Sequence, residues 1–242
     1  MPTTSDAEKA DLLNTYFANQ TQLNDDGKTP PYPTVPPIER QLSSVTLIQN
    51  EVEDVLRNLQ IGKASGFDGI SNRILREDSR QLSGPLCSLF NYSLHSAKIP
   101  LSWKDANVCA VFKKGDSSLP NNYRPISLLS CVEKAFEKVL FKHIYNHLHD
   151  TNFLTPVQSG FLPGHSTVSQ LTLLYNTFCK ALDEGLEVRA VFFDKGLLVK
   201  LQNAGITGSL FEWFSNYLFN RRQRVIFPGT SSTWKGIGAG VP

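Results

Sequence analysis

The spacing of apolar residues predicts helices over much of the chain. Apolar side chains recur every three or four positions over residues 7–17, 46–59 and 128–148, which is the period of an amphipathic helix. Thr46 is placed as the N-cap of the second of these helices. A further helix is expected over residues 71–95, broken at Gly84-Pro85 because proline cannot donate a backbone hydrogen bond. Shorter helices are expected over residues 167–182, 197–203 and 210–220.

Short apolar runs predict strands between these helices. Residues 103–112 form a β-rich run, the Lys113-Lys114-Gly115-Asp116 segment turns, and residues 123–126 return as the second strand of a hairpin. Residues 188–193 form a short apolar strand that ends at Asp194, and residues 223–227 and 233–237 form a β pair. Helices and strands mix without regular alternation, so the predicted fold class is α+β.

Three regions are expected along the chain. Residues 1–45 hold the first helix and a linker with five prolines, residues 46–98 are helical, and residues 99–242 mix helices and strands. Of the charged groups, residues 1–60 carry 4 basic and 9 acidic ones, a net charge of −5. Residues 61–242 carry a net charge of +7, so the net charge of the whole chain is +2. A basic body suits contact with phosphate, and it equally suits an ordinary solvated surface.

Composition narrows the class of protein. The chain has 242 residues, of which 40% are apolar and 19% charged, and this usage excludes a collagen-like or wholly disordered chain. No apolar run is long enough for a membrane helix, and the N-terminus lacks the apolar core of a signal peptide. The four cysteines lie far apart without a C-x-x-C pair, which indicates buried, reduced thiols in a cytoplasmic or nuclear protein that is not secreted.

Two groups of residues are candidates for chemistry. Asp194, at the end of an apolar strand, could hold a hard cation such as Mg²⁺ or could cap the helix that follows. Lys113, Lys114 and Arg124 flank the hairpin tip, where they could grip a triphosphate or a nucleic-acid backbone, or simply be solvated.

Other motifs point to no specific chemistry. The glycines of residues 62–69 do not follow the P-loop pattern and are expected to serve positive φ angles at a helix exit. His143, His147 and His149 lack the glutamate of a zinc-protease helix, so a solvated helix face is expected. Residues 221–224 (Arg-Arg-Gln-Arg) could touch a phosphate or form an exposed turn. No Ser/His/Asp constellation is placed.

Several segments together resemble the reverse transcriptase of non-LTR (LINE-type) retrotransposons. In the family's order, these segments are E-K-A-D-L-L-N-T-Y-F (8–17), K-A-S-G-F-D-G-I (63–70), I-P-L-S-W-K-D-A-N-V (99–108), F-K-K-G-D (112–116), N-Y-R-P-I-S-L-L (122–129), Q-S-G-F-L-P-G-H-S-T (158–167), A-V-F-F-D (190–194) and G-V-P (240–242). The resemblance covers nearly the whole chain.

This resemblance implies a polymerase right hand, with the fingers and part of the palm in residues 99–242 and a helical N-terminal extension in residues 46–98. It implies RNA-directed DNA synthesis from an RNA template, a DNA primer and deoxynucleoside triphosphates, with two Mg²⁺ ions. By resemblance Asp194 is a catalytic, metal-binding aspartate, and Lys113, Lys114 and Arg124 hold the triphosphate. Gln158, Gly160 and Phe161 would line the template or nucleotide path. No membrane or protein partner is implied.

Two departures from the family's pattern change the expected activity. The sequence passes from Asp194 directly to Lys195-Gly196, without the family's D-x-S-K-A-F-D-x-V connector, and no later A-D-D segment follows. Because each ion needs several oxygen ligands, one carboxylate cannot organise a two-metal site. We therefore expect a family member that does not polymerise DNA as this chain. The alternative is a non-catalytic RNA- or DNA-binding module that uses the basic fingers-like surface.

Overall fold

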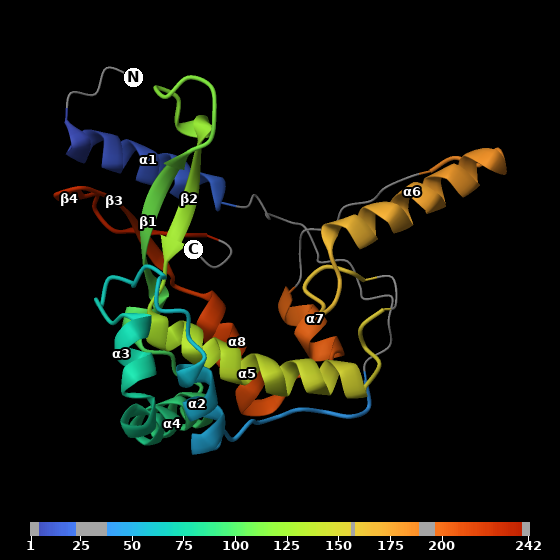
Figure 1. The fold of residues 1–242 in the computed structure, drawn as a ribbon, viewed down its shortest axis with the longest axis horizontal. Helices are drawn as coiled ribbons and strands as arrows, with labels where there is room; N and C mark the ends of the chain where they lie inside the picture. Colours follow the sequence, from blue (N-terminus) through green and yellow to red (C-terminus); the bar gives the residue numbers. More distant parts are fainter. Residues whose placement is uncertain (1–4, 23–37, 156–157, 189–196, 239–242) are drawn as a thin grey trace.

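The structure is a computed structural model that describes residues 5–22, 38–155, 158–188 and 197–238. It has an α+β architecture, in which a small mixed sheet lies beside a group of packed helices and one helix projects away from both (Figure 1). The helices are α1 (Asp6–Gln20), α2 (Gln49–Arg57), α3 (Asn72–Glu77), α4 (Ser79–Ser96), α5 (Cys131–Asp150), α6 (Thr167–Asp183), α7 (Leu197–Asn203) and α8 (Gly208–Leu218). The strands are β1 (Asp105–Phe112), β2 (Tyr123–Leu128), β3 (Arg222–Phe227), β4 (Thr230–Ser231) and β5 (Lys235–Gly236).

Most elements match the predicted ones within a few residues, and two boundaries differ. The residue before α2 is Ile48, which makes no side-chain cap, so the prediction of Thr46 as the N-cap is wrong. The predicted break at Gly84-Pro85 is also wrong, because Pro85 lies inside α4. The helix is interrupted at Asp78 instead, between α3 and α4. The face of α4 that bears Ser83, Cys87 and Phe90 is buried on both sides of Pro85, and this packing outweighs the one missing hydrogen bond.

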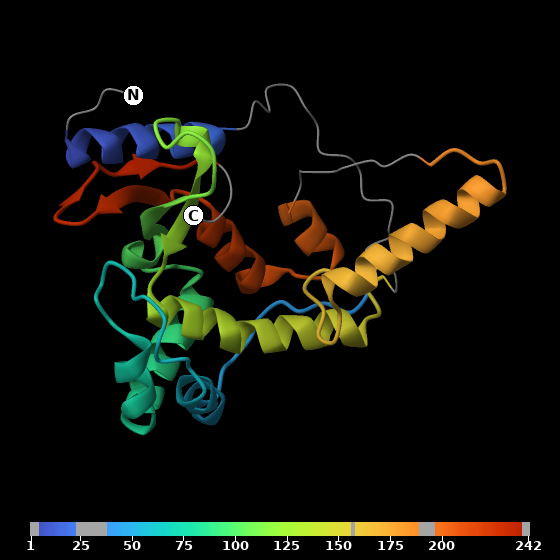
Figure 2. The same cartoon turned by 45° about the horizontal axis from the view of Figure 1, so that its top comes forward.

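The sheet has the strand order β2-β1-β3-β4, with β5 also paired to β3. β1 and β2 form the predicted antiparallel hairpin, whereas β1 and β3 pair in parallel, with Val108 opposite Val225. Helix α1 covers one face of this sheet (Figure 2), where its residues Ala10, Leu13 and Phe17 pack on these two valines. The capping box at the start of α1, formed by Ser5 and Glu8, fixes where that helix begins.

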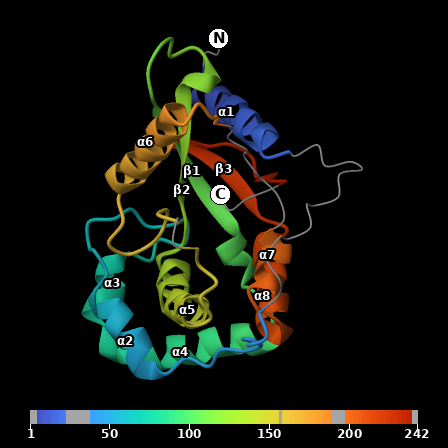
Figure 3. The same cartoon turned by 90° about the vertical axis from the view of Figure 1, so that its right-hand side faces the viewer.

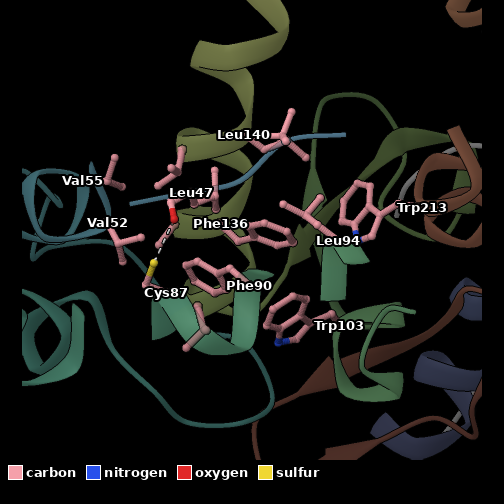
Figure 4. Close-up of a cluster of buried hydrophobic side chains, with 14 of the residues drawn as sticks. Leu47, Val52, Val55, Cys87, Phe90, Leu94, Trp103, Phe136, Leu140 and Trp213 are labelled. Atoms are coloured by element: carbon pink, nitrogen blue, oxygen red, sulfur yellow. Dashed lines mark hydrogen bonds between the residues drawn. The ribbon is translucent and has the colours of Figure 1, made fainter. Parts of the chain in front are cut away.

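The larger core lies among the helices (Figure 3), where α5 passes between α2 and α8 and above α4. Aromatic rings fill its centre (Figure 4): Phe90 stacks on Phe136 with centroids 4.6 Å apart, and Trp213 meets Phe136 edge-on at 5.3 Å. The Trp213 indole N–H donates to Ser93 Oγ at 3.0 Å, so this buried polar atom is satisfied. The 3-10 helix η1 (Leu101–Lys104) leads directly into β1. Its Trp103 is buried in the helical core and so attaches the start of β1 to that core.

The cysteines are all free, and Cys87 and Cys131 are buried as predicted, while Cys109 and Cys179 are only half-buried. Among the helices that the structure describes, none is both long enough and apolar enough to cross a membrane.

Candidate nucleic-acid interface

The tip of the β1–β2 hairpin presents basic side chains to solvent. Lys113 and Lys114 are exposed in the connecting loop, and Arg124 is exposed on β2. The loop is closed by a hydrogen bond from the Lys113 N–H to the Asn122 carbonyl at 2.7 Å. The Ser118 N–H donates to Asp116 at 2.8 Å, and this bond lowers the pKa of that carboxyl, so it is anionic at neutral pH.

The register of the strands fixes which side chains share the face opposite α1, here called the open face. Residues directly opposite each other point to the same side of a sheet, and the side alternates along each strand. The face therefore has four rows: Asp105 and Arg222; then Leu128, Asn107 and Arg224; then Ile126, Cys109 and Ile226; then Arg124 and Val111. Val111 is 45% exposed and Ile126 is 46% exposed. The open face is thus an apolar band with arginine at both ends.

The arginines at the β3 end of the open face surround one tryptophan. The guanidinium carbons of Arg222 and Arg224 lie 5.4 Å and 4.7 Å from the centroid of the Trp234 ring. Arg224 also donates to Asn107 Oδ1 at 2.8 Å. Arg222 forms a two-pronged ion pair with Asp105, at 2.8 Å and 2.6 Å, and this pair raises the pKa of Arg222. These contacts hold two cations and an aromatic ring at the edge of an exposed apolar surface.

The loop of residues 62–69 closes this end of the open face. Its Phe67 ring meets Trp234 edge-on, with centroids 6.0 Å apart. Gly66 lies so close to the start of α5 that a Cβ on it would be 2.7 Å from the Ser130 backbone nitrogen. Gly69 has the positive φ angle that the sequence predicts, 71°, whereas Gly62 and Gly66 do not, so the prediction is wrong for those two. The glycines therefore serve a close approach and a turn, while Lys63 and Phe67 remain at the surface of the loop.

Arg221 is buried, which the sequence did not predict. Its side chain is 0% exposed and pairs with Glu133 at 3.1 Å, while it also donates to the Trp103 carbonyl at 3.0 Å. The guanidinium lies 4.7 Å from the Tyr217 ring centroid. Burial raises the pKa of Glu133 to about 7, and the nearby guanidinium opposes that rise. Arg221 thus belongs to the core that joins α5 to α8, and of the Arg-Arg-Gln-Arg stretch only Arg222 and Arg224 reach the open face.

The structure does not bring all the predicted site residues together. Gln158, Gly160 and the fully exposed Phe161 lie in the segment after α5, and Figures 1 and 2 show this segment on the opposite side of the molecule from the hairpin tip. Asp194 and residues 189–193 of the predicted strand before it lie outside the described residues.

Of the three histidines on α5, His149 is solvated as the sequence predicts, with its side chain 72% exposed, whereas His143 and His147 are not. His147 is buried and its Nε2 bonds the Ala204 carbonyl at 2.8 Å, whereas His143 lies 3.2 Å from Glu51 on α2. These two side chains attach α5 to its neighbours. In the part of the chain that the structure describes, no group of three or more His, Cys, Asp or Glu side chains could hold a metal ion.

The chain is similar over most of its length to several known proteins of one kind. The chain is 27% identical to "Probable RNA-directed DNA polymerase from transposon BS" of Drosophila melanogaster, over 85% of this chain and 24% of that protein. It is 30% identical to "Probable RNA-directed DNA polymerase from transposon X-element" of the same species, over 79% of this chain and 22% of that protein. It is 29% identical to "RNA-directed DNA polymerase from mobile element jockey" of the same species, over 83% of this chain and 23% of that protein.

The chain thus spans less than a quarter of the length of these relatives. No protein-family model matches it.

Proposed function

Because this chain belongs to the RNA-directed DNA polymerases of non-LTR retrotransposons, we propose that its open face binds single-stranded RNA. In this proposal the sheet and its hairpin correspond to the fingers of a polymerase right hand. The proposal also gives the hairpin tip a role in holding a nucleoside triphosphate.

The observation that carries the proposal is the arrangement of charge and aromatic surface on the open face. Arg124 lies at one end of the apolar band, and Arg222 and Arg224 lie around Trp234 at the other end. Proteins that bind single strands combine cations, which contact phosphates, with aromatic and apolar surfaces, on which bases stack. The open face offers both kinds of contact along one line of the sheet.

The remaining sites enter the proposal through the family resemblance. Lys113 and Lys114 would contact the triphosphate together with Arg124, since guanidinium and ammonium groups both bind phosphate oxygens. Gln158, Gly160 and Phe161 would contact the template. Asp194 would be a Mg²⁺ ligand, and because it lies outside the described residues we derive no catalytic step through that ion.

The proposal includes the expectation that this chain does not polymerise DNA. Its support is the sequence after Asp194, which continues directly as Lys195-Gly196 where the resemblance leads one to expect a longer connector. A primer-extension assay on poly(rA)/oligo(dT) with Mg²⁺ tests this expectation. Template-dependent incorporation of deoxynucleotide would overturn it without affecting the proposal for RNA binding.

RNA binding itself is tested by fluorescence anisotropy with a labelled single-stranded RNA over a range of salt concentrations. Affinity should fall as salt rises, because bound phosphates release counterions, with a slope of about −0.7 per phosphate contact in a single strand. Arg124→Ala should reduce the steepness of that slope by about 0.7 and weaken binding.

The matched control is Arg80→Ala, because Arg80 is also exposed but lies on α4 away from the sheet. This control should bind RNA as the unchanged chain does. Binding that does not respond to salt, or equal affinity of the two variants, would reject the open face as the RNA site.

A further inference from the structure

Helix α5 carries a stripe of lysine and aromatic side chains that the open face does not include. Its lysines are Lys134, Lys138 and Lys142, and its aromatic side chains are Phe141, Tyr145 and His149. At 3.6 residues per turn, all six positions fall within an arc of about 100° on the helix surface. We call this set the α5 stripe; it extends for about 22 Å along the helix axis.

The aromatic side chains of the α5 stripe stack on one another. The Phe141 and Tyr145 rings have centroids 5.6 Å apart with planes 28° from parallel, and Tyr145 and His149 follow at 6.3 Å and 28°. Phe141 is 52% exposed, although it is large and apolar. A stacked column of rings with an exposed end is a surface on which nucleic-acid bases stack favourably.

The lysines of the α5 stripe line a groove of about 1020 Å³ between α5, α2 and the loop after α2. Leu59 and Leu128 also line the groove, and the loop after α2 contributes Lys63. Within the described ranges, none of these four ammonium groups forms a salt bridge. The groove therefore carries positive charge that a ligand can neutralise.

Two carboxylates also line the groove, and one of them is already engaged. Glu137 accepts a hydrogen bond from the Tyr217 hydroxyl, and Asp54 is exposed on α2. Four cations against two carboxylates leave the groove with a net positive charge. This balance favours an anionic ligand over a cationic or purely apolar one.

The groove and the open face share one residue, Leu128. Leu128 lies in the same row of the open face as Asn107 and Arg224, and it also lines the groove. A strand that follows β2 from Arg124 towards Leu128 therefore reaches the groove and the first lysine of the stripe. A base-stacked strand with the duplex rise of about 3.4 Å per nucleotide would place about six nucleotides along the stripe.

We propose that the α5 stripe and its groove bind a second segment of the single strand that occupies the open face. The lysines contact phosphates, and Phe141 and Tyr145 stack on bases. This inference rests on the proposed function, since it extends the bound strand beyond the sheet.

The test compares two triple variants that remove the same charge. K134Q/K138Q/K142Q changes the stripe, and K98Q/K180Q/K200Q changes three exposed lysines elsewhere. Anisotropy is measured with labelled single-stranded RNA of about 6 and about 20 nucleotides, since only the longer strand can cover both surfaces. The stripe variant should bind the longer RNA at least about tenfold more weakly, with a salt slope less steep by about 2, because it loses three phosphate contacts. The control variant should change neither value by comparable amounts.

A second variant tests the stacking. Phe141→Ala should weaken binding of the longer RNA about fivefold or more, as loss of one base–aromatic stack does in other single-strand sites. Tyr92→Ala, which removes an exposed ring from α4, is its control. Unchanged thermal unfolding of each variant shows that the fold is intact.

The outcomes separate this inference from the proposed function. If the unchanged chain binds RNA and both triple variants bind it equally, the stripe is not a nucleic-acid site and the open-face proposal stands. If the unchanged chain does not bind RNA, the proposed function itself fails. A competition experiment adds polyglutamate, an acidic peptide, at the same concentration of charge as the RNA. If polyglutamate displaces the RNA, the groove is assigned to an acidic protein partner and the proposal is overturned.

Discussion

Substitution of Gly66 by alanine should destabilise the chain because the position has no room for a side chain. A Cβ there would lie 2.7 Å from the Ser130 nitrogen, 2.8 Å from the Leu129 carbonyl carbon and 2.9 Å from its oxygen. Ordinary contacts begin at 3.4 Å, so the backbone would have to separate by about 0.7 Å. Since Ser130 caps α5 through its bonds to Val132 and Glu133, this movement also disturbs the helix start.

Overpacking of this kind costs about 1–3 kcal/mol, and here both sides of the contact are backbone, which cannot rotate away. With a urea dependence of about 2 kcal/mol per molar, the midpoint of unfolding should fall by about 1 M. The assay is urea denaturation followed by tryptophan fluorescence. The control is Gly62→Ala, in the same loop, where a Cβ would meet nothing within 4 Å and stability should be nearly unchanged. Equal midpoints for the two variants would refute the assignment of Gly66 to a close backbone approach.

Three further substitutions test the buried polar groups. Burial raises the pKa of Glu133 from 4.5 to about 7, so its proton stabilises the fold fully below about pH 4.5 and this contribution is lost as pH rises through about 7. Glu133→Gln should remove this loss of stability at high pH. The urea midpoint is measured at about pH 5 and about pH 8, and an equal shift between the two pH values in the variant and in the unchanged chain would contradict the prediction. Arg221→Met leaves the Glu133 carboxylate buried without its cation and should cost about 3–5 kcal/mol at about pH 8; calorimetry showing an unchanged melting temperature would disprove this pairing. Asn14→Ala deprives Gln223 Nε2 and the Thr233 carbonyl of their partner and should cost about 1–3 kcal/mol in the same measurement, a loss that would be absent if water replaced both bonds.

Local pattern predicted the elements well and their long-range pairing poorly. The apolar periodicity of α1 and α5 located those helices to within a few residues, because each buries a regular face. The β1–β2 hairpin was likewise evident from its turn. The parallel pairing of β1 with β3 was not, because no local signal specifies which distant strand completes a sheet.

The candidate site shows the same division. Lys113, Lys114 and Arg124 were predicted from one turn and are exposed there. Arg221 and Arg222 are adjacent in sequence, yet Arg221 is buried and pairs with Glu133. The Arg222 side chain is 51% exposed and pairs with Asp105. Only the three-dimensional position of a partner carboxylate distinguishes them. Glu133 itself carried a sequence signal, because it is an acidic residue on the apolar side of a strongly periodic helix. Such a residue could have indicated a buried cation elsewhere in the chain.

The parallel β1–β3 pairing also governs when the sheet can assemble. Asp105 and Arg222 are 117 positions apart, and Asn14 bonds to Gln223 across 209 positions. A ribosome that adds about 5–20 residues per second completes β1 and β2 many seconds before β3 emerges. During that interval both outer edges of the nascent hairpin are unpaired, and α1 lacks Val225, one of the two valines on which it packs. Such non-local contacts slow folding, so co-translational chaperones should be needed more for this sheet than for the helical core beside it.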